Sequence, residues 1–184
     1  ISTNQGRDTV GSLVTFEAGR PRKSEYRRFR IKGEGQQNDY AAIAEVVTRY
    51  IERRRNEGKP MPDLIVIDGG KGQLSAADAV LNQLGAADIP LISLAKREEE
   101  IFVRGRAESI RLSRRSPALR LLQRARDEAH RYGVAYSRLR RSQRTISSAL
   151  LEIPGIGASR RTTLLQTFGS LAGIRAASVA EIAA

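Results

Sequence analysis

The 184-residue sequence contains no cysteine, no tryptophan and a single histidine, His130. Without cysteine the chain has no disulfides, thiol nucleophiles or zinc–thiolate sites, which is typical of cytoplasmic proteins. One histidine also excludes a multi-histidine metal site within the chain. No apolar run approaches the ~18–20 residues of a membrane span, and residues 1–7 show no signal-peptide pattern. We therefore expect a cytoplasmic protein without a membrane partner.

Positive charge, in contrast, is abundant. The 32 Lys and Arg residues outnumber the 20 Asp and Glu residues, giving a net charge of +12 and an isoelectric point near 10.9. Hydrophobic residues make up 40% of the chain, which is enough for a packed core. The charge predicts a polyanionic partner, although a solvated arginine-rich surface explains it as well.

Hydrophobic periodicity changes repeatedly along the first 138 residues. Alternation predicts the strands of a hairpin, a continuous apolar run predicts a buried strand, and 3.6-residue spacing predicts helices, the first of them capped by Asp39. The expected strands are 9–16, 24–32, 64–67, 90–95, 101–103 and 109–112, and the expected helices are 39–56, 71–84 and 117–138. This order predicts an α/β fold with a mixed sheet flanked by helices, whose first strand is incomplete here.

The composition changes after Arg138. Residues 139–146 are polar and arginine-rich and are expected to form a linker. Residues 147–184 combine helical patterns with punctuating glycines, which predicts a small all-α domain. The expected organisation is an α/β domain over 1–138, the linker, and a helical domain over 147–184.

Asp68 ends the buried strand and is followed by two glycines and Lys71. Ligands bind at the carboxyl edge of such sheets, the glycines permit close approach, and a carboxylate there suits Mg²⁺ or Mn²⁺. A helix-capping role for Asp68 explains the pattern equally well. A nucleotide-binding loop over residues 69–73 is a weaker interpretation, because the P-loop spacing is absent.

The helix expected over 117–138 carries the histidine. On a helical wheel Ala118 and Ala129 face the core, whereas Gln123, Arg126 and His130 share a flank that can border a cleft. A lone histidine is more often structural or merely exposed than a ligand, so both interpretations stay open.

Two further segments suggest contact with a phosphate backbone. Gly155 and Gly157 lie between two helical patterns, followed by Arg160 and Arg161. Glycines there expose backbone N–H groups at a helix N-terminus, and the spacing resembles a helix-hairpin-helix motif, which binds DNA without reading its sequence. A plain connection between helices is the alternative.

The second segment is the strand over 24–32. Its outward face is expected to carry Tyr26, Arg28 and Arg30, a combination of ring and cations suited to a nucleic-acid backbone. Solvated strand residues explain the pattern equally well.

Residues 24–29 (SEYRRF), 68–73 (DGGKGQ) and 123–131 (QRARDEAHR), in this order, resemble the C-terminal half of UvrC, a component of the bacterial UvrABC excinuclease. The resemblance implies an RNase H-like endonuclease domain followed by a tandem helix-hairpin-helix domain, whose second hairpin would lie beyond Ala184. It also implies a DNA-repair hydrolase linked to the SOS response. Such an enzyme makes the 5′ incision beside a lesion in nucleotide excision repair, acting on damaged duplex DNA held by UvrB.

In that family the metal site consists of Asp, Asp and His, with Mn²⁺ or Mg²⁺ as the cofactor. The second Asp corresponds to Asp68 and the His to His130, whereas the first Asp would stand immediately before Ile1, and Thr3 occupies a position where His is common. We therefore expect the chain as given to be catalytically weak or inactive. Lys71 and Arg126 are candidates for stabilising phosphate charge. A non-catalytic DNA-binding adaptor is the alternative function.

Overall fold

The computed structural model describes residues 2–4, 10–31, 38–151, 153 and 155–183. The chain divides into two compact units, residues 1–137 and residues 138–184. Each is described by itself.

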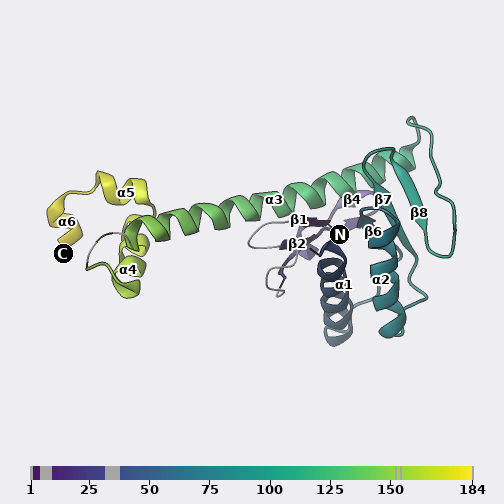
Figure 1. Ribbon diagram of the computed structural model, residues 1–184, viewed down its shortest axis with the longest axis horizontal. Coiled ribbons are helices and arrows are strands. Elements are labelled where there is room, and N and C mark those ends of the chain that lie inside the picture. Colours follow the sequence, from purple (N-terminus) through teal and green to yellow (C-terminus); the bar gives the residue numbers. More distant parts are fainter. Residues whose placement is uncertain (1, 5–9, 32–37, 152, 154, 184) are drawn as a thin grey trace. The chain divides into compact units, whose positions relative to one another are not determined.

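The first unit is built on two three-stranded sheets that meet along one pair of strands (Figure 1). Strand β2 pairs antiparallel with β1 and β5, while β6 pairs parallel with β7, which pairs antiparallel with β8. Strand β1 contacts β6, so the antiparallel sheet β1-β2-β5 adjoins the mixed sheet β6-β7-β8, and together they form one layer. The predicted α/β fold class is confirmed. The strands are β1 (Ser2–Asn4), β2 (Val10–Leu13), β5 (Arg27–Arg30), β6 (Ile65–Asp68), β7 (Leu91–Ala95) and β8 (Glu100–Val103).

Helices α1 (Asp39–Asn56) and α2 (Lys71–Gln83) pack side by side on one face of this layer. Apolar residues at helical spacing on α1 and α2 meet those strand residues that point to the same face, and together they form the main core. Its fully buried members include Ile43, Ile51, Ile67 and Leu81. The cap of α1 is Asn38, whose side chain accepts from the N–H groups of residues 40 and 41, and not the predicted Asp39.

Helix α3 (Pro117–Leu151) covers the opposite face with its first turns. Leu119 packs with Leu94 and Ile101 in a second apolar cluster. Further along, the Ser12 hydroxyl of β2 donates a hydrogen bond to the Ala129 carbonyl at 2.8 Å. These contacts fix the face of the first unit on which the candidate site lies.

A short segment connects β2 to β5 where a single long hairpin was predicted. It contains the small ladder of β3 (Phe16–Glu17) with β4 (Arg20–Pro21) and the 3-10 turn η1 (Lys23–Glu25). The predicted hairpin itself is confirmed by the pairing of β2 with β5. The predicted pair of strands over 101–112 is reduced to β8 and a single bridge between Ile101 and Ile110.

The predicted linker is helical. Residues 139–146 continue α3, so the prediction that this helix ends near Arg138 is wrong. The segment contains neither glycine nor proline, and its three arginines together with Leu139 and Gln143 favour a helix. A polar composition indicates exposure and does not by itself interrupt a helix.

The second unit contains the end of α3 and three shorter helices. These are α4 (Ala158–Phe168), α5 (Leu171–Ala176) and α6 (Val179–Ala183). Helices α4 and α5 contact each other, and Gly169 ends α4 with a φ of 71°. In the described part of the chain, no helix has the length and apolar character needed to cross a membrane.

Gly11 marks the closest approach of the sheet to α1. A Cβ atom at this position would lie 2.1 Å from Cγ2 of Val46. Gly11→Ala should therefore overpack the core and lower the free energy of unfolding of the first unit by ~1–3 kcal/mol, measured by urea denaturation. Gly70→Ala is the matched control, because the nearest atom to its Cβ would be 3.8 Å away. Equal midpoints for the two variants would contradict this packing.

Candidate functional site

Asp68 is the last residue of β6 and lies opposite Leu94 of β7 in the parallel register. The backbone leaves the strand directly afterwards, with Gly69 at a φ of 152° and its N–H donating to the Leu94 carbonyl at 3.1 Å. Ile65 and Ile67 point into the core on the α1–α2 side, so alternation directs Asp68 to the face that α3 covers. The carboxylate is half-exposed there.

The glycines after Asp68 make room for side chains of the chain itself. A Cβ at Gly69 would meet the Gln73 side chain at 2.7 Å, and one at Gly72 would meet the Tyr40 hydroxyl at 2.7 Å. Gln73 accepts a hydrogen bond from the Gly70 N–H at 3.1 Å and so caps the start of α2. Gly69 and Gly72 therefore accommodate Gln73 and Tyr40, and the close approach of a ligand to this loop stays a prediction.

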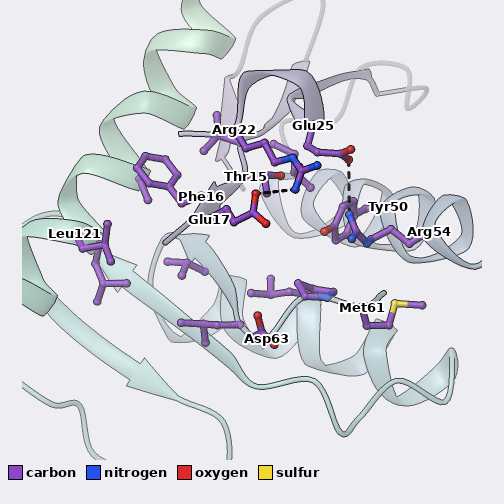
Figure 2. A pocket seen from close by; sticks show the side chains of 18 of the residues that line it. Thr15, Phe16, Glu17, Arg22, Glu25, Tyr50, Arg54, Met61, Asp63 and Leu121 are labelled. Carbon is purple, nitrogen blue, oxygen red and sulfur yellow. Dashed lines mark hydrogen bonds and ion pairs between the residues drawn. The ribbon is translucent and has the colours of Figure 1, made fainter. Parts of the chain in front are cut away.

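Asp68 lines a pocket of about 610 Å³. Its walls come from the end of β2 and the β3–β4 segment, from the loop before β6 and from α3, including Val14 and Arg126. Figure 2 shows apolar side chains such as Phe16, Met61 and Leu121 along this pocket. Sequence reasoning missed the pocket, because its walls lie far apart in the chain and carry no common motif.

Ion pairs line the other parts of the pocket (Figure 2). Arg22 contacts Glu17 at 2.6 Å, and Glu25 contacts Arg54 at 3.7 Å and Lys59 at 3.1 Å. The hydrogen bond from Lys59 lowers the pKa of Glu25 below its ordinary value. Glu25 is thus ionised at neutral pH and balanced by Arg54 and Lys59.

His130 lies on α3, one turn after Arg126 on the same flank, as predicted. Its side chain is exposed, and it is not among the described residues that line the pocket. The neighbouring Ala129 is held against β2 by Ser12, so this part of α3 is fixed over the sheet. His130 and Asp68 therefore belong to elements that pack on the same face of the first unit.

Arg126 is engaged by two carboxylates. Its guanidinium contacts Glu99 at 2.8 Å and Asp127 at 3.0 Å, and its side chain is only 11% exposed. Burial by itself would lower the pKa of Arg126, but the hydrogen bonds to Glu99 and Asp127 outweigh burial and raise the pKa. Lys71, the first residue of α2, is exposed and places its Nζ 3.4 Å from the Ala107 carbonyl.

Strand β5 exposes Arg28 and Arg30 as predicted, but not Tyr26, which precedes the strand. Arg28 is exposed and its guanidinium stacks 3.9 Å over the Tyr132 ring, while Arg30 is exposed on the strand. Tyr26 was expected on the outward face, but it is only 6% exposed and packs edge-on against Tyr132 at 5.2 Å. Burial raises the pKa of Tyr26 to about 12. The prediction for Tyr26 is wrong because α3 covers this side of the strand.

In the second unit the glycine segment forms a turn before α4. Gly155 has a φ of 85°, and Gly157 caps the helix with a φ of −81°. The guanidinium of Arg160 donates to the Gly155 carbonyl at 2.9 Å, and Arg161 is half-exposed on the first turn of α4. The two backbone conformations differ, since only Gly155 adopts one that L-residues disfavour.

The metal site expected from the resemblance requires three protein ligands. Among the residues that the structure describes, no three of His, Asp and Glu come together to hold a metal ion. A carboxylate from Asp68 and an imidazole from His130 suit a divalent cation chemically, but they supply at most two of the three ligands.

The chain is similar to the members of one known protein family. Residues 1–134 match the family model described as the UvrC RNase H endonuclease domain. The chain is 60% identical over its whole length to UvrABC system protein C of Gemmatimonas aurantiaca. It is 50% identical over its whole length to the protein of the same name from Acidobacterium capsulatum, and 48% identical to that from Gloeobacter violaceus. It spans about 30% of the length of these curated relatives.

Proposed function

The chain belongs to the UvrC family, and on that premise we propose that it contains the nuclease centre and a DNA-binding part of a structure-specific DNA endonuclease. The reaction is the 5′ incision of bacterial nucleotide excision repair, a metal-dependent hydrolysis of a phosphodiester. The substrate is damaged duplex DNA delivered with UvrB, in the bacterial cytoplasm. The observation that carries the proposal is the position of Asp68, a half-exposed carboxylate at the carboxyl edge of a parallel strand pair, opening into a pocket.

The register of the first strand supports a third ligand at the same place. Ser2 lies opposite Ser12 in the antiparallel ladder of β1 and β2. Continuing this register, a residue immediately before Ile1 would lie opposite Val14, which lines the pocket together with Asp68. Directly opposite residues of two paired strands point to the same face of the sheet. An aspartate opposite Val14 would therefore share with Asp68 the pocket that Val14 lines.

Asp68, His130 and that aspartate would hold a divalent ion, Mn²⁺ or Mg²⁺. When bound, the ion supplies Lewis-acid polarisation of the phosphoryl group. Lys71 is exposed near the end of β6 and contributes positive charge for the phosphate. Arg126 is not assigned to the phosphate, because two carboxylates already pair with it.

The second unit would hold the duplex. The N–H groups of the Gly155–Gly157 turn and the side chains of Arg160 and Arg161 suit backbone phosphates, without contact to the bases. Arg28 and Arg30 add exposed cations on β5 of the first unit.

The proposal is tested by adding the missing ligand. A chain extended by one aspartate before Ile1 should nick lesion-containing duplex DNA in the presence of Mn²⁺ and the UvrB–DNA complex. The chain as given, and a chain extended by asparagine, should show little or no activity, since neither completes the ligand set. Strand cleavage is followed on a denaturing gel with an end-labelled duplex. No gain of activity from the aspartate would count against Asp68 and His130 as ligands.

A non-catalytic DNA-binding adaptor is the second candidate. It is favoured by the exposure of His130, which is not among the described residues that line the pocket. On this alternative, Asp68→Ala leaves the repair function of the longer protein intact, whereas changes at the Gly155–Gly157 turn remove it.

A further inference from the structure

The turn between β7 and β8 lies at the same sheet edge as Asp68. Asp68 is opposite Leu94, and Lys96 follows two residues later, about 7 Å further along the strand direction. The turn comprises residues 96–99 and closes on the pair Ala95 and Glu100. The turn therefore begins at the sheet edge at which β6 ends in the proposed catalytic carboxylate.

In sequence the stretch 96–100, KREEE, is slightly acidic. In the structure, however, its carboxylates are paired with other cations. Glu98 and Glu100 contact Arg111 at 3.7 and 3.1 Å, and Glu99 contacts Arg126 at 2.8 Å. These pairs leave the two cations of the stretch uncompensated.

Lys96 and Arg97 are both exposed. Neither has an ion-pair or hydrogen-bond partner among the described residues. Two adjacent cations, the compact ammonium group of Lys96 and the planar guanidinium group of Arg97, suit successive phosphates of a nucleic-acid strand.

Glu99 connects the turn to helix α3. Glu99 has a φ of 53°, a left-handed conformation that is unfavourable for a residue other than glycine. Its carboxylate bonds Arg126, whose side chain is 11% exposed and lines the pocket that Asp68 lines. The Glu99–Arg126 pair thus ties the turn to α3 beside Asp68.

We propose that Lys96 and Arg97 bind the phosphodiester backbone of the DNA strand that is cut at Asp68, and that Arg126 is a positioning residue that orients this turn through Glu99. The inference rests on the proposed function and adds two phosphate contacts and the role of the buried arginine. It explains why Arg126 lines the pocket although its charge is already neutralised.

The salt dependence of duplex binding tests the two contacts. Each phosphate contact contributes about 0.9 to the slope of log K against log[salt] for duplex DNA. Lys96→Ala/Arg97→Ala should therefore lower the slope by about 1.8 and weaken binding about tenfold at low salt, measured by fluorescence anisotropy. The matched control, Arg53→Ala/Arg55→Ala, removes the same charge at the end of α1, where the chain leads into the start of β6. It should change the slope by less than half as much.

The absence of cysteine permits a direct test of proximity. Arg97→Cys, labelled with a tethered iron chelate, should cleave bound DNA at discrete positions near the 5′ incision site. Arg53→Cys, labelled in the same way, should give only weak, dispersed cleavage.

The positioning role has its own measurement. Glu99→Gln and Arg126→Gln should lower the salt slope by about one and shift the cleavage from the residue-97 label. Arg126→Lys, which keeps a charge for Glu99, should restore much of both. A merely structural role would change the thermal unfolding midpoint without moving the salt slope of the folded protein.

The outcomes separate the two proposals. An unchanged slope in Lys96→Ala/Arg97→Ala, or equal cleavage from positions 53 and 97, overturns this inference. The proposed function then still stands if the aspartate-extended chain nicks DNA through Asp68. Duplex binding without salt dependence in the unsubstituted chain overturns both.

Discussion

Asp68→Asn, in the chain extended by an aspartate before Ile1, is expected to lower Mn²⁺-dependent nicking by more than about 100-fold. Substitutions that only support a metal ligand cost 10–100-fold, and the loss of a ligand should exceed that range. The amide keeps the size of the side chain but removes its negative charge. Because Asp68 is half-exposed, the fold should tolerate this change.

Asp63→Asn is the matched control for this variant. Asp63 lines the same pocket but lies in the loop before β6, at the start of the strand that Asp68 ends. Its nicking rate should stay within about threefold of the parent, a change of less than 1 kcal/mol in the barrier. Both variants should bind duplex DNA like the parent in an anisotropy assay. Equal losses of nicking in the two variants would show that the charge of the pocket matters and not ligation by Asp68.

Asp68 could be placed from the sequence because its signals are local. A short continuous apolar run predicts a buried strand, and the glycines after it fix where the strand ends. The structure places that end as predicted, with the run as β6 and the helix after it as α2. The boundaries of α1 were equally clear, because its helical spacing and the glycine after it are local signals.

The sequence predicted the buried face of α3 less accurately. The helical wheel places Ala118 on the core side, but Ala118 is exposed and Leu119 is 1% exposed. The buried face is rotated toward the flank of Arg126, because Leu94 and Ile101 of the sheet meet the helix there. Which side of a helix faces the core depends on the surface that it covers, and one sequence does not specify that surface.

The ion-pair partners of the β7–β8 turn could not be predicted from the sequence either. Along the sequence its cations and carboxylates follow one another with no evident preference for a partner. Arg111 and Arg126, which neutralise the carboxylates, lie 11 and 27 residues away from their partners. Only the fold shows that the carboxylates of the turn are paired, whereas Lys96 and Arg97 are exposed.

Gly155→Ala is expected to weaken duplex binding by the chain about tenfold or more. Gly155 has a φ of 85°, and a left-handed conformation costs a residue with a Cβ about 1–2 kcal/mol, which corresponds to a factor of about ten. Relieving that strain would move the Gly155 carbonyl, which accepts from Arg160 at 2.9 Å, and with it the N–H groups of the turn. Binding is measured by anisotropy at fixed salt, after circular dichroism has shown that α4 is retained.

Two further alanine variants separate the turn from general stability. Gly169 also has a positive φ, 71°, and open space around it, but it lies at the other end of α4. Gly169→Ala therefore carries a similar strain and should leave duplex binding within about twofold of the parent. Gly157 has a φ of −81°, which any residue adopts, and no atom within 4 Å of its Cβ position. Weaker duplex binding by Gly157→Ala would thus indicate that the DNA backbone approaches the turn closely. Equal losses of duplex binding in Gly155→Ala and Gly169→Ala would instead attribute the effect to the stability of the second unit. They would contradict the proposal that the N–H groups of the Gly155–Gly157 turn bind phosphates.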